Sequence, residues 1–278
     1  MAPPNAASRA ATVRERARAE LSREIKEEAR RQLAASGAGE LSLRAVAKEL
    51  GMVSSALYRY YPSRDDLLTA LIIDAYNALG AAAEGAIAAG QAAAGSADLA
   101  RPAPPARDRW IAACHAVRDW ALANPHEYAL IYGSPVPGYR APEATIGPAA
   151  RVPLAFVGVL GEALAGGELG GVGGVGGVGG GGGALPVTGS LAAQADALSA
   201  SLAQPVPVTR GAGGAGGAGG AAHAALPPDV LVRAVIAWTQ LFGMISFELF
   251  GQFVGSFEPA DALFLHATEQ LAAFVGLR

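Results

Sequence analysis

The sequence predicts an all-α protein whose helices form two domains. Apolar residues recur at intervals of three and four along most of the chain, the spacing that places side chains on one face of a helix. Serine, glycine and proline stand where these patterns begin and end, as is typical of helix boundaries. The chain has 278 residues, of which 51% are hydrophobic, so it is long enough to bury two cores.

The first helix is predicted over residues 12–35. Its apolar residues follow one another at intervals of four, and charged residues fill most positions between them. The apolar positions are Val13, Ala17, Leu21, Ile25, Ala29 and Leu33. Gly37 and Gly39 end the helix, because glycine is a poor helix former. Residues 1–11 show no such period, so we expect them to form a disordered arm.

Residues 41–67 predict two short helices that meet at a steep angle, with another helix directly after them. Ser42 can cap the first, and Gly51 can adopt the left-handed conformation that ends it. The apolar face of this helix consists of Leu43, Val46, Ala47 and Leu50. Ser54 can cap the second helix, Leu57 returns to the core, and Pro62 ends the helix. This is the pattern of a helix-turn-helix, whose second helix fits the major groove of DNA.

A long helix then begins at Ser63. Asp65 and Asp66 lie in its first turn, where carboxylates complement the helix dipole. Its apolar residues at helical spacing are Leu67, Leu68, Leu71, Ile72 and Ala75. We expect the helix to continue to about residue 89 and to join an N-terminal DNA-binding domain, residues 12–75, to a C-terminal domain, residues 76–278.

Residues 13–71 resemble the N-terminal DNA-binding domain of TetR-type (TetR/AcrR) transcriptional regulators. The motif positions that carry the resemblance are residues 43–47, 51–54, 57–61 and 63–64. The resemblance implies a homodimer on double-stranded DNA, with two recognition helices roughly 34–36 Å apart on a palindromic operator. An ordinary helical hairpin without a nucleic-acid role is the alternative.

The residues for DNA contact follow from this resemblance and from side-chain chemistry. Hydroxyl groups, cations and backbone amides at helix N-termini bind phosphates, which fix position without reading sequence. The phosphate candidates are Ser42, Tyr58, Tyr60 and Arg64. The candidates for base edges are Ser54, Ser55, Ala56 and Arg59. Arg44 fits either role, a solvated surface position is the alternative for Arg59, and Tyr61 is expected to pack against the first helix.

Charge and composition bound the function further. Residues 1–70 contain twelve Lys or Arg and nine Asp or Glu, so this end carries +3 in a chain of net charge −3. That balance argues against a protein that holds DNA by bulk charge alone. Cys114 is the single cysteine, and the four histidines show no metal-ligand spacing, so we expect no disulfide, no metal and no cofactor. Without a signal peptide or a run of eighteen uncharged apolar residues, we expect a soluble cytoplasmic protein with no membrane span.

The C-terminal domain is predicted to contain helices over residues 107–123, 125–132 and 143–165. Residues 166–225 are rich in glycine and alanine. They offer few side chains to offset the entropy lost on ordering. We therefore expect a flexible insertion there, with a short helix at residues 191–202.

Two helices close the sequence, at residues 229–250 and from Glu258 onward. Apolar residues occupy almost every side of the first of them, and such a helix must be covered on every side. A terminal pair of helices covers only part of itself, so the surplus apolar face predicts a two-fold dimer through a four-helix bundle. Burial beneath the other helices of the same chain is the alternative.

Residues 237–249 resemble the Trp-x-x-x-His-Gly segment of the WHG class of TetR-type C-terminal domains, with Phe242 at the histidine position. The resemblance implies a helical ligand-binding and dimerisation domain. We expect its effector to be a small apolar or aromatic molecule. The pocket candidates are Trp110, Trp120, Tyr132, Phe156 and Trp238. Core packing is the alternative for each, and His115 and Arg118 are candidates for polar contacts.

These parts together predict a sequence-specific regulator, a repressor whose operator binding is relieved by an effector. The helix that begins at Ser63 is expected to transmit the change. A DNA-binding dimer without an effector, or one controlled by a protein partner, is the alternative. An enzyme is disfavoured, because Cys114 and His115 are neighbours on one helix, about 100° apart, and cannot form a nucleophile–base pair.

Overall fold

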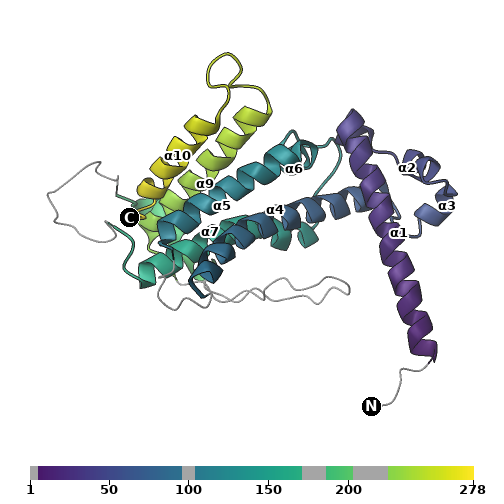
Figure 1. Ribbon diagram of the computed structural model, residues 1–278, viewed down its shortest axis with the longest axis horizontal. Helices are drawn as coiled ribbons and strands as arrows, with labels where there is room; N and C mark the ends of the chain where they lie inside the picture. Colours follow the sequence, from purple (N-terminus) through teal and green to yellow (C-terminus); the bar gives the residue numbers. More distant parts are fainter. Residues whose placement is uncertain (1–5, 96–103, 171–185, 203–224) are drawn as a thin grey trace. The chain divides into compact units, whose positions relative to one another are not determined.

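The structure, a computed structural model, describes residues 6–95, 104–170, 186–202 and 225–278 (Figure 1). Every regular element in these residues is a helix, which confirms the predicted fold class. Within them, an isolated antiparallel bridge joins Leu169 to Leu277. The helices are α1 (Ala6–Ser36), η1 (Ala38–Glu40), α2 (Leu43–Glu49), α3 (Ser54–Leu57), α4 (Arg64–Gly95), α5 (Ala106–Ala123), α6 (Pro125–Tyr132), η2 (Glu143–Thr145), α7 (Ile146–Ala165), α8 (Gly189–Leu202), α9 (Pro228–Leu249) and α10 (Asp261–Phe274).

The chain divides into two compact units. The first comprises residues 1–78 and 123–149, and the second comprises residues 79–122 and 150–278. The division inside α4 lies close to the boundary that the sequence predicts at residue 75. Residues 123–149 differ from the prediction, because the sequence places them in the C-terminal domain whereas they pack with the first unit.

One buried core unites α1, α2, α3 and the first turns of α4. The fully buried side chains come from all four helices and include Ile25, Ala29, Val46, Ala47, Leu57, Leu67 and Leu68. Burying a large aliphatic side chain contributes about 1.5–3 kcal/mol. Helices as short as α2 and α3 are not stable alone in water. Their place in the unit therefore depends on this shared core.

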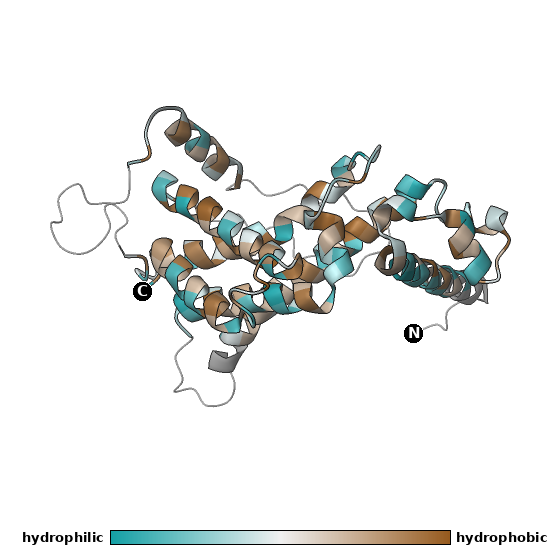
Figure 2. Cartoon of the chain, turned by 90° about the horizontal axis from the view of Figure 1, so that it is seen from above, coloured by the Kyte–Doolittle hydropathy of each residue, from teal (hydrophilic) through white to brown (hydrophobic). Residues whose placement is uncertain are grey.

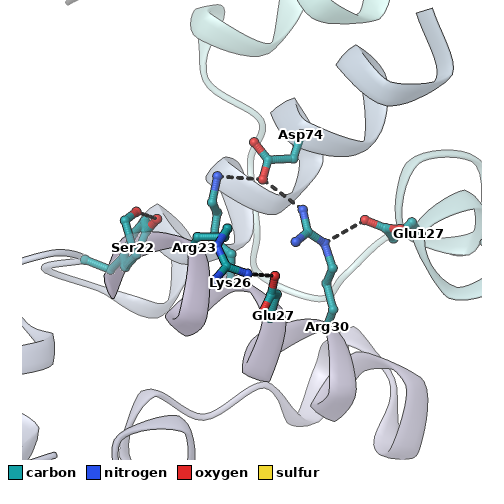
Figure 3. Close-up of polar contacts among 8 residues, drawn as sticks. Ser22, Arg23, Lys26, Glu27, Arg30, Asp74 and Glu127 are labelled. Atoms are coloured by element: carbon teal, nitrogen blue, oxygen red, sulfur yellow. Dashed lines mark hydrogen bonds and ion pairs between the residues drawn. The ribbon is translucent and has the colours of Figure 1, made fainter. Parts of the chain in front are cut away.

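Residues 123–149 are held on the first unit by apolar packing and by polar contacts. Leu130, Ile131 and Val136 pack against its core, and the hydroxyls of Tyr139 and Thr69 are 2.9 Å apart. Asp74 on α4 accepts from Lys26 Nζ at 2.7 Å and from Arg30 Nη2 at 2.9 Å, both on α1. Figure 3 shows that Arg30 also reaches α6, where its Nε donates to Glu127 at 2.8 Å.

Helix α1 is longer than its sequence predicts. It begins at Ala6, so residues 6–11 are helical and the predicted disordered arm is wrong there, while residues 1–5 lie outside the described residues. Ala6, Ala7, Ala10 and Ala11 are strong helix formers, which favours extension of the helix without any apolar period. For the same reason α4, which is rich in alanine, continues past residue 89 to Gly95.

The second unit has a core of its own, formed by α5, α7, α9 and α10. Its fully buried residues include Val117, Leu160, Leu241, Ile245 and Phe264. Arg118 on α5 is only 6% exposed. Its Nε donates to Glu248 of α9 at 2.7 Å, and its Nη1 donates to Asp261 of α10 at 2.9 Å. This cation therefore joins three helices of the unit.

Part of the predicted flexible insertion is ordered, which corrects that prediction. Helix α8 packs against α9, with Ala195 and Ser199 buried. The Ser199 hydroxyl donates to the Leu226 carbonyl at 3.0 Å. Residues 166–170 are also fixed, because the Gly170 amide donates to Gly276 at 2.7 Å. Residues 171–185 and 203–224 of the insertion lie outside the described residues.

Three helical stretches among the described residues are long and apolar enough to cross a membrane. They are Arg64–Gln91, Glu143–Ala165 and Pro228–Leu249. Between 39% and 44% of each most apolar window is buried inside the protein. Much of their apolar surface is therefore used in packing, and the absence of membrane spans stays a prediction.

Candidate nucleic-acid interface

The turn between α2 and α3 has the geometry that the sequence predicts. Ser42 Oγ accepts from the Ala45 amide at 3.4 Å and caps α2. Gly51 adopts φ 64°, and the Met52 amide donates to Ala47 at 2.8 Å, which closes the helix and reverses the chain. An L side chain at Gly51 would be strained by this left-handed conformation.

Helix α3 is anchored by a single buried residue. Leu57 is fully buried, and this fixes which of its neighbours face water. Ser55, Tyr58 and Arg59 are exposed, while Ser54 and Ala56 are half-buried. The predicted cap at Ser54 is wrong, because Val53 is the N-cap and no side chain caps the helix. The Ser54 hydroxyl is therefore not used at the helix N-terminus.

The two tyrosines after α3 have different environments. Tyr61 is 9% exposed, and its hydroxyl is 2.8 Å from Ser22 Oγ on α1, so the predicted packing against the first helix is confirmed. Tyr60 is half-buried beside the same helix. The Arg18 guanidinium carbon is 5.6 Å from the centre of the Tyr60 ring, a cation–π contact.

The arginines near this surface divide into those with internal partners and those without. Arg64 donates from Nε to Leu41 at 3.1 Å and from Nη2 to Ala38 at 2.6 Å. Its guanidinium holds the connection between α1 and α2, and its role as a phosphate ligand stays a prediction. Arg44 and Arg59 are exposed, and neither forms an ion pair with any described residue.

The five residues predicted to line an effector pocket are divided between the two units. Trp110 and Phe156 contact each other in the second unit, with ring centres 4.5 Å apart. Tyr132 belongs to the first unit, beside Tyr128 and Tyr76, and its place in a pocket with the other four stays a prediction. Burial raises the pKa of the Tyr132 phenol, so this hydroxyl stays protonated at neutral pH.

The other two pocket candidates, Trp238 and Trp120, also belong to the second unit. Trp238 packs against Phe242 on α9, with ring centres 5.8 Å apart. Trp120 on α5 is half-buried. The indole nitrogens of Trp110 and Trp238 are buried and have no hydrogen-bond partner among the described residues. Buried donors are nearly always paired, so these two are unusual.

The polar candidates near these aromatic rings are already engaged. His115 contacts Phe264 edge-on, with ring centres 5.3 Å apart. Arg118 stacks over the same ring at 4.9 Å, besides its ion pairs. Both side chains therefore contribute to the packing of α5 against α10. In the described part of the chain, no group of three or more His, Cys, Asp or Glu side chains has the geometry of a metal site.

Large apolar side chains are exposed on α9, on α10 and on the segment between them. They are Val235, Ile236, Phe247, Phe250, Val254, Phe257, Leu265 and Phe274. A hollow of 510 Å³ is lined by residues of α9, α10 and this segment that include Met244, Phe247, Phe253 and Leu263, and we call this lining the apolar face. Large apolar patches are uncommon on the surface of monomeric soluble proteins.

Two family models match the chain. Residues 25–71 match the bacterial regulatory proteins of the tetR family, and residues 110–271 match the tetracyclin repressor-like C-terminal domain. The second match covers more than half of the chain and includes Trp238. The chain belongs to the TetR family. This family consists of transcriptional regulators and not of enzymes. The predicted family is therefore confirmed, and so is the prediction that the protein is not an enzyme.

Individual relatives agree with the family. The chain is 47% identical over 158 residues to the HTH-type transcriptional regulators Rv1816 of Mycobacterium tuberculosis and Mb1846 of Mycobacterium bovis, a match of 55% of this chain. It spans about three fifths, 61%, of the length of these curated relatives. The solved structure of the regulatory protein SCO4313 has a TM-score of 0.61 and 33% identity, and the match covers 93% of this chain and 98% of that one. A protein of unknown function from Rhodococcus sp. RHA1 has the same fold, with a TM-score of 0.59, 22% identity and 92% and 95% coverage.

The sequence analysis missed two features of the first unit. Arg18 was assigned no role, although Arg14, Arg18 and Ser22 follow one another at intervals of four. Glu127 and Asp74 were also missed, because their partners on α1 are remote in the sequence. The four-residue interval of Arg14, Arg18 and Ser22 can be read from the sequence. The contact of Arg18 with Tyr60 can be seen only in the folded chain.

Proposed function

We propose that this TetR-family protein binds duplex DNA through α3 and the residues around it. The observation that carries the proposal is the α2–α3 turn, which buries Leu57 and leaves Ser55, Tyr58 and Arg59 in water. Arg59 is the side chain for base edges, since a guanidinium can bridge two guanine acceptors. Ser54, Ser55 and Ala56 contact base edges beside it, and we call these four residues the reading surface. Ser42, Arg44, Tyr58 and Tyr60 bind phosphates.

The test of this proposal uses two variants of Tyr58. DNA from the region around the coding sequence is searched by footprinting, and affinity for a protected fragment is measured by gel shift. Hydrogen bonds to charged groups contribute about 1.5–3 kcal/mol, so Tyr58→Phe should weaken binding about tenfold or more. Tyr58→Ala should lose at least as much, with the circular dichroism spectrum unchanged. Unchanged affinity in both variants would overturn this assignment of Tyr58, and no protected fragment would overturn DNA binding itself.

We propose that the protein is a homodimer through the open apolar face of α9 and α10. Two copies of this face would cover each other in a four-helix bundle and present two reading surfaces to a palindromic operator. Phe247 is 54% exposed on this face, and Phe247→Arg should give monomers in sedimentation experiments. Leu191→Arg on α8 is the matched control, since Leu191 is 46% exposed outside the face. A dimeric Phe247→Arg protein would contradict the proposal.

We infer further that the protein is a cytoplasmic repressor relieved by a small apolar or aromatic effector. The unpaired indole N–H groups of Trp110 and Trp238 support this part, because a ligand oxygen could accept from them. An effector that favours the DNA-incompetent state by about 1–3 kcal/mol would suffice to change occupancy. Saturable stabilisation by a compound in thermal shift, together with its release of bound DNA, is the expected result. Stabilisation without release would instead favour the alternative of an effector-independent regulator or of control by a protein partner.

A further inference from the structure

We propose that the N-terminal part of α1 is a second DNA-binding surface, in which Arg14 and Arg18 bind backbone phosphates beside the site of α3. The inference rests on the proposed function and extends it to residues that precede the tetR-family match, which starts at residue 25. Its partner is the operator duplex itself.

The first described side chains of α1, those of residues 14–20, lie outside the buried core. The buried residues of α1 start at Ile25, and every residue from Arg14 to Glu20 is exposed. Residues 14–20 make up about 10 Å of helix that precedes Ile25, the first buried residue of α1. Figure 2 shows hydrophilic colour along much of this helix, which starts near the N mark. An exposed helical segment that carries three arginines is accounted for if it binds a charged partner.

The face of this segment is fixed by two contacts with the residues after α3. Ser22 is 2.8 Å from the Tyr61 hydroxyl, and Arg18 lies over the Tyr60 ring. Residues four apart lie on one face of a helix, so Arg14, Arg18 and Ser22 form one row. That row runs from the end of the reading surface toward the N-terminus. A duplex bound at α3 therefore meets Arg18 first and Arg14 one turn farther along.

Ion pairing distinguishes these two arginines from four cations farther along α1. Arg23, Lys26, Arg30 and Arg31 all bind carboxylates of the protein. Arg14 and Arg18 bind none of the described carboxylates, so their guanidinium groups are open to an external anion. Phosphate is the anion that the adjacent reading surface brings within reach, and arginine binds it through two parallel hydrogen bonds.

The expected effect follows from counterion release. Each phosphate contact adds about 0.9 to the slope of log affinity against log salt, which is about eightfold in affinity at 0.1 M salt. Arg18→Gln removes one contact from each subunit of a dimer, so the slope should fall by about 1.8. Arg14→Gln should have a similar or smaller effect, and neither variant should change which sequence is protected.

The experiment compares three variants of the full chain on one footprinted DNA fragment. Arg16→Gln is the matched control, because Arg16 is exposed and unpaired like Arg18 but lies about 160° around the helix from it. Gel-shift affinities are measured between 50 and 300 mM salt. A lower slope for Arg18→Gln and Arg14→Gln, with Arg16→Gln like the wild type, supports the proposal.

Other outcomes overturn it in recognisable ways. Equal slopes for all four proteins would show that α1 does not contact DNA, while the proposed function stays intact. An equal loss in Arg16→Gln would indicate a general effect of net charge and would also overturn the assignment. Failure of the wild-type protein to bind any fragment would instead count against the proposed function.

Discussion

Replacing Arg118 is expected to loosen the second unit more than any other single change of charge there. The guanidinium is 6% exposed and holds Glu248 through Nε at 2.7 Å and through Nη2. Glu248 is 16% exposed at its side chain, so Arg118→Met leaves a carboxylate with little water to replace its partner. The same change releases Asp261 at the start of α10.

The magnitude depends on how far each partner is buried. Removing one member of a buried ion pair costs about 3–5 kcal/mol. Since Glu248 keeps some contact with water, the lower end applies, and about 3 kcal/mol corresponds to a factor of about 150 in the unfolding equilibrium. Asp261 is 71% exposed, and an exposed pair contributes about 0–1 kcal/mol. The variant Asp261→Asn should therefore be close to the wild type.

The assay uses the tryptophan fluorescence of the protein during urea unfolding. All three tryptophans, Trp110, Trp120 and Trp238, lie in the second unit, so their fluorescence follows that unit selectively. With a urea dependence of about 2 kcal/mol per molar, Arg118→Met should lower the midpoint by about 1.5 M. Protein concentration is held constant, because association would stabilise the folded state.

The decisive comparison is between the two partners of Arg118. Glu248→Gln should lower the midpoint by at least half as much as Arg118→Met, and Asp261→Asn should leave it nearly unchanged. If Arg118→Met unfolds within 0.3 M of the wild type, or if Asp261→Asn is the more damaging variant, the burial argument is refuted.

Two more predictions concern the other buried or paired groups. In Asp74→Asn, Lys26 and Arg30 lose their shared carboxylate, so the segment of residues 123–149 should exchange its amide hydrogens several-fold faster, as read by mass spectrometry; an unchanged rate would show that apolar packing alone holds the segment. Burial raises the pKa of the Cys114 thiol, so stability is unaffected below about pH 8.5, where the unfolded thiol is protonated, and falls by about 2 kcal/mol by pH 10. Cys114→Ala should lack this alkaline fall in urea titrations, and an identical pH profile in the two proteins would contradict the assignment.

Local signals in the sequence were enough to predict the helix-turn-helix of α2 and α3. The cap at Ser42, the left-handed Gly51 and the buried Leu57 each depend on residues within a few positions of them. Their spacing alone predicts a helix-turn-helix and its exposed side chains. The same local reasoning misplaced the cap of α3, since Val53 and Ser54 are adjacent and both are compatible with an N-terminal boundary.

The role of each charged or aromatic side chain depended instead on partners that are distant along the chain. Arg64 contacts the Leu41 carbonyl 23 residues earlier, and Arg30 contacts Glu127 97 residues later. The aromatic residues show the same dependence on distant partners. Tyr132 was a pocket candidate because it is aromatic, and it packs with Tyr76 in the first unit. No periodicity encodes such contacts.

The sequence by itself therefore determined the helices, the family and the side chains that face outward from α3, because those features arise from hydrogen bonds and apolar spacing within a few residues. Tertiary structure decided which cations are used inside the protein and which stay open to an external anion. It also decided that residues 123–149 pack with the first unit. The physical reason is that burial and ion pairing depend on distances between helices, and these are set only when the helices pack.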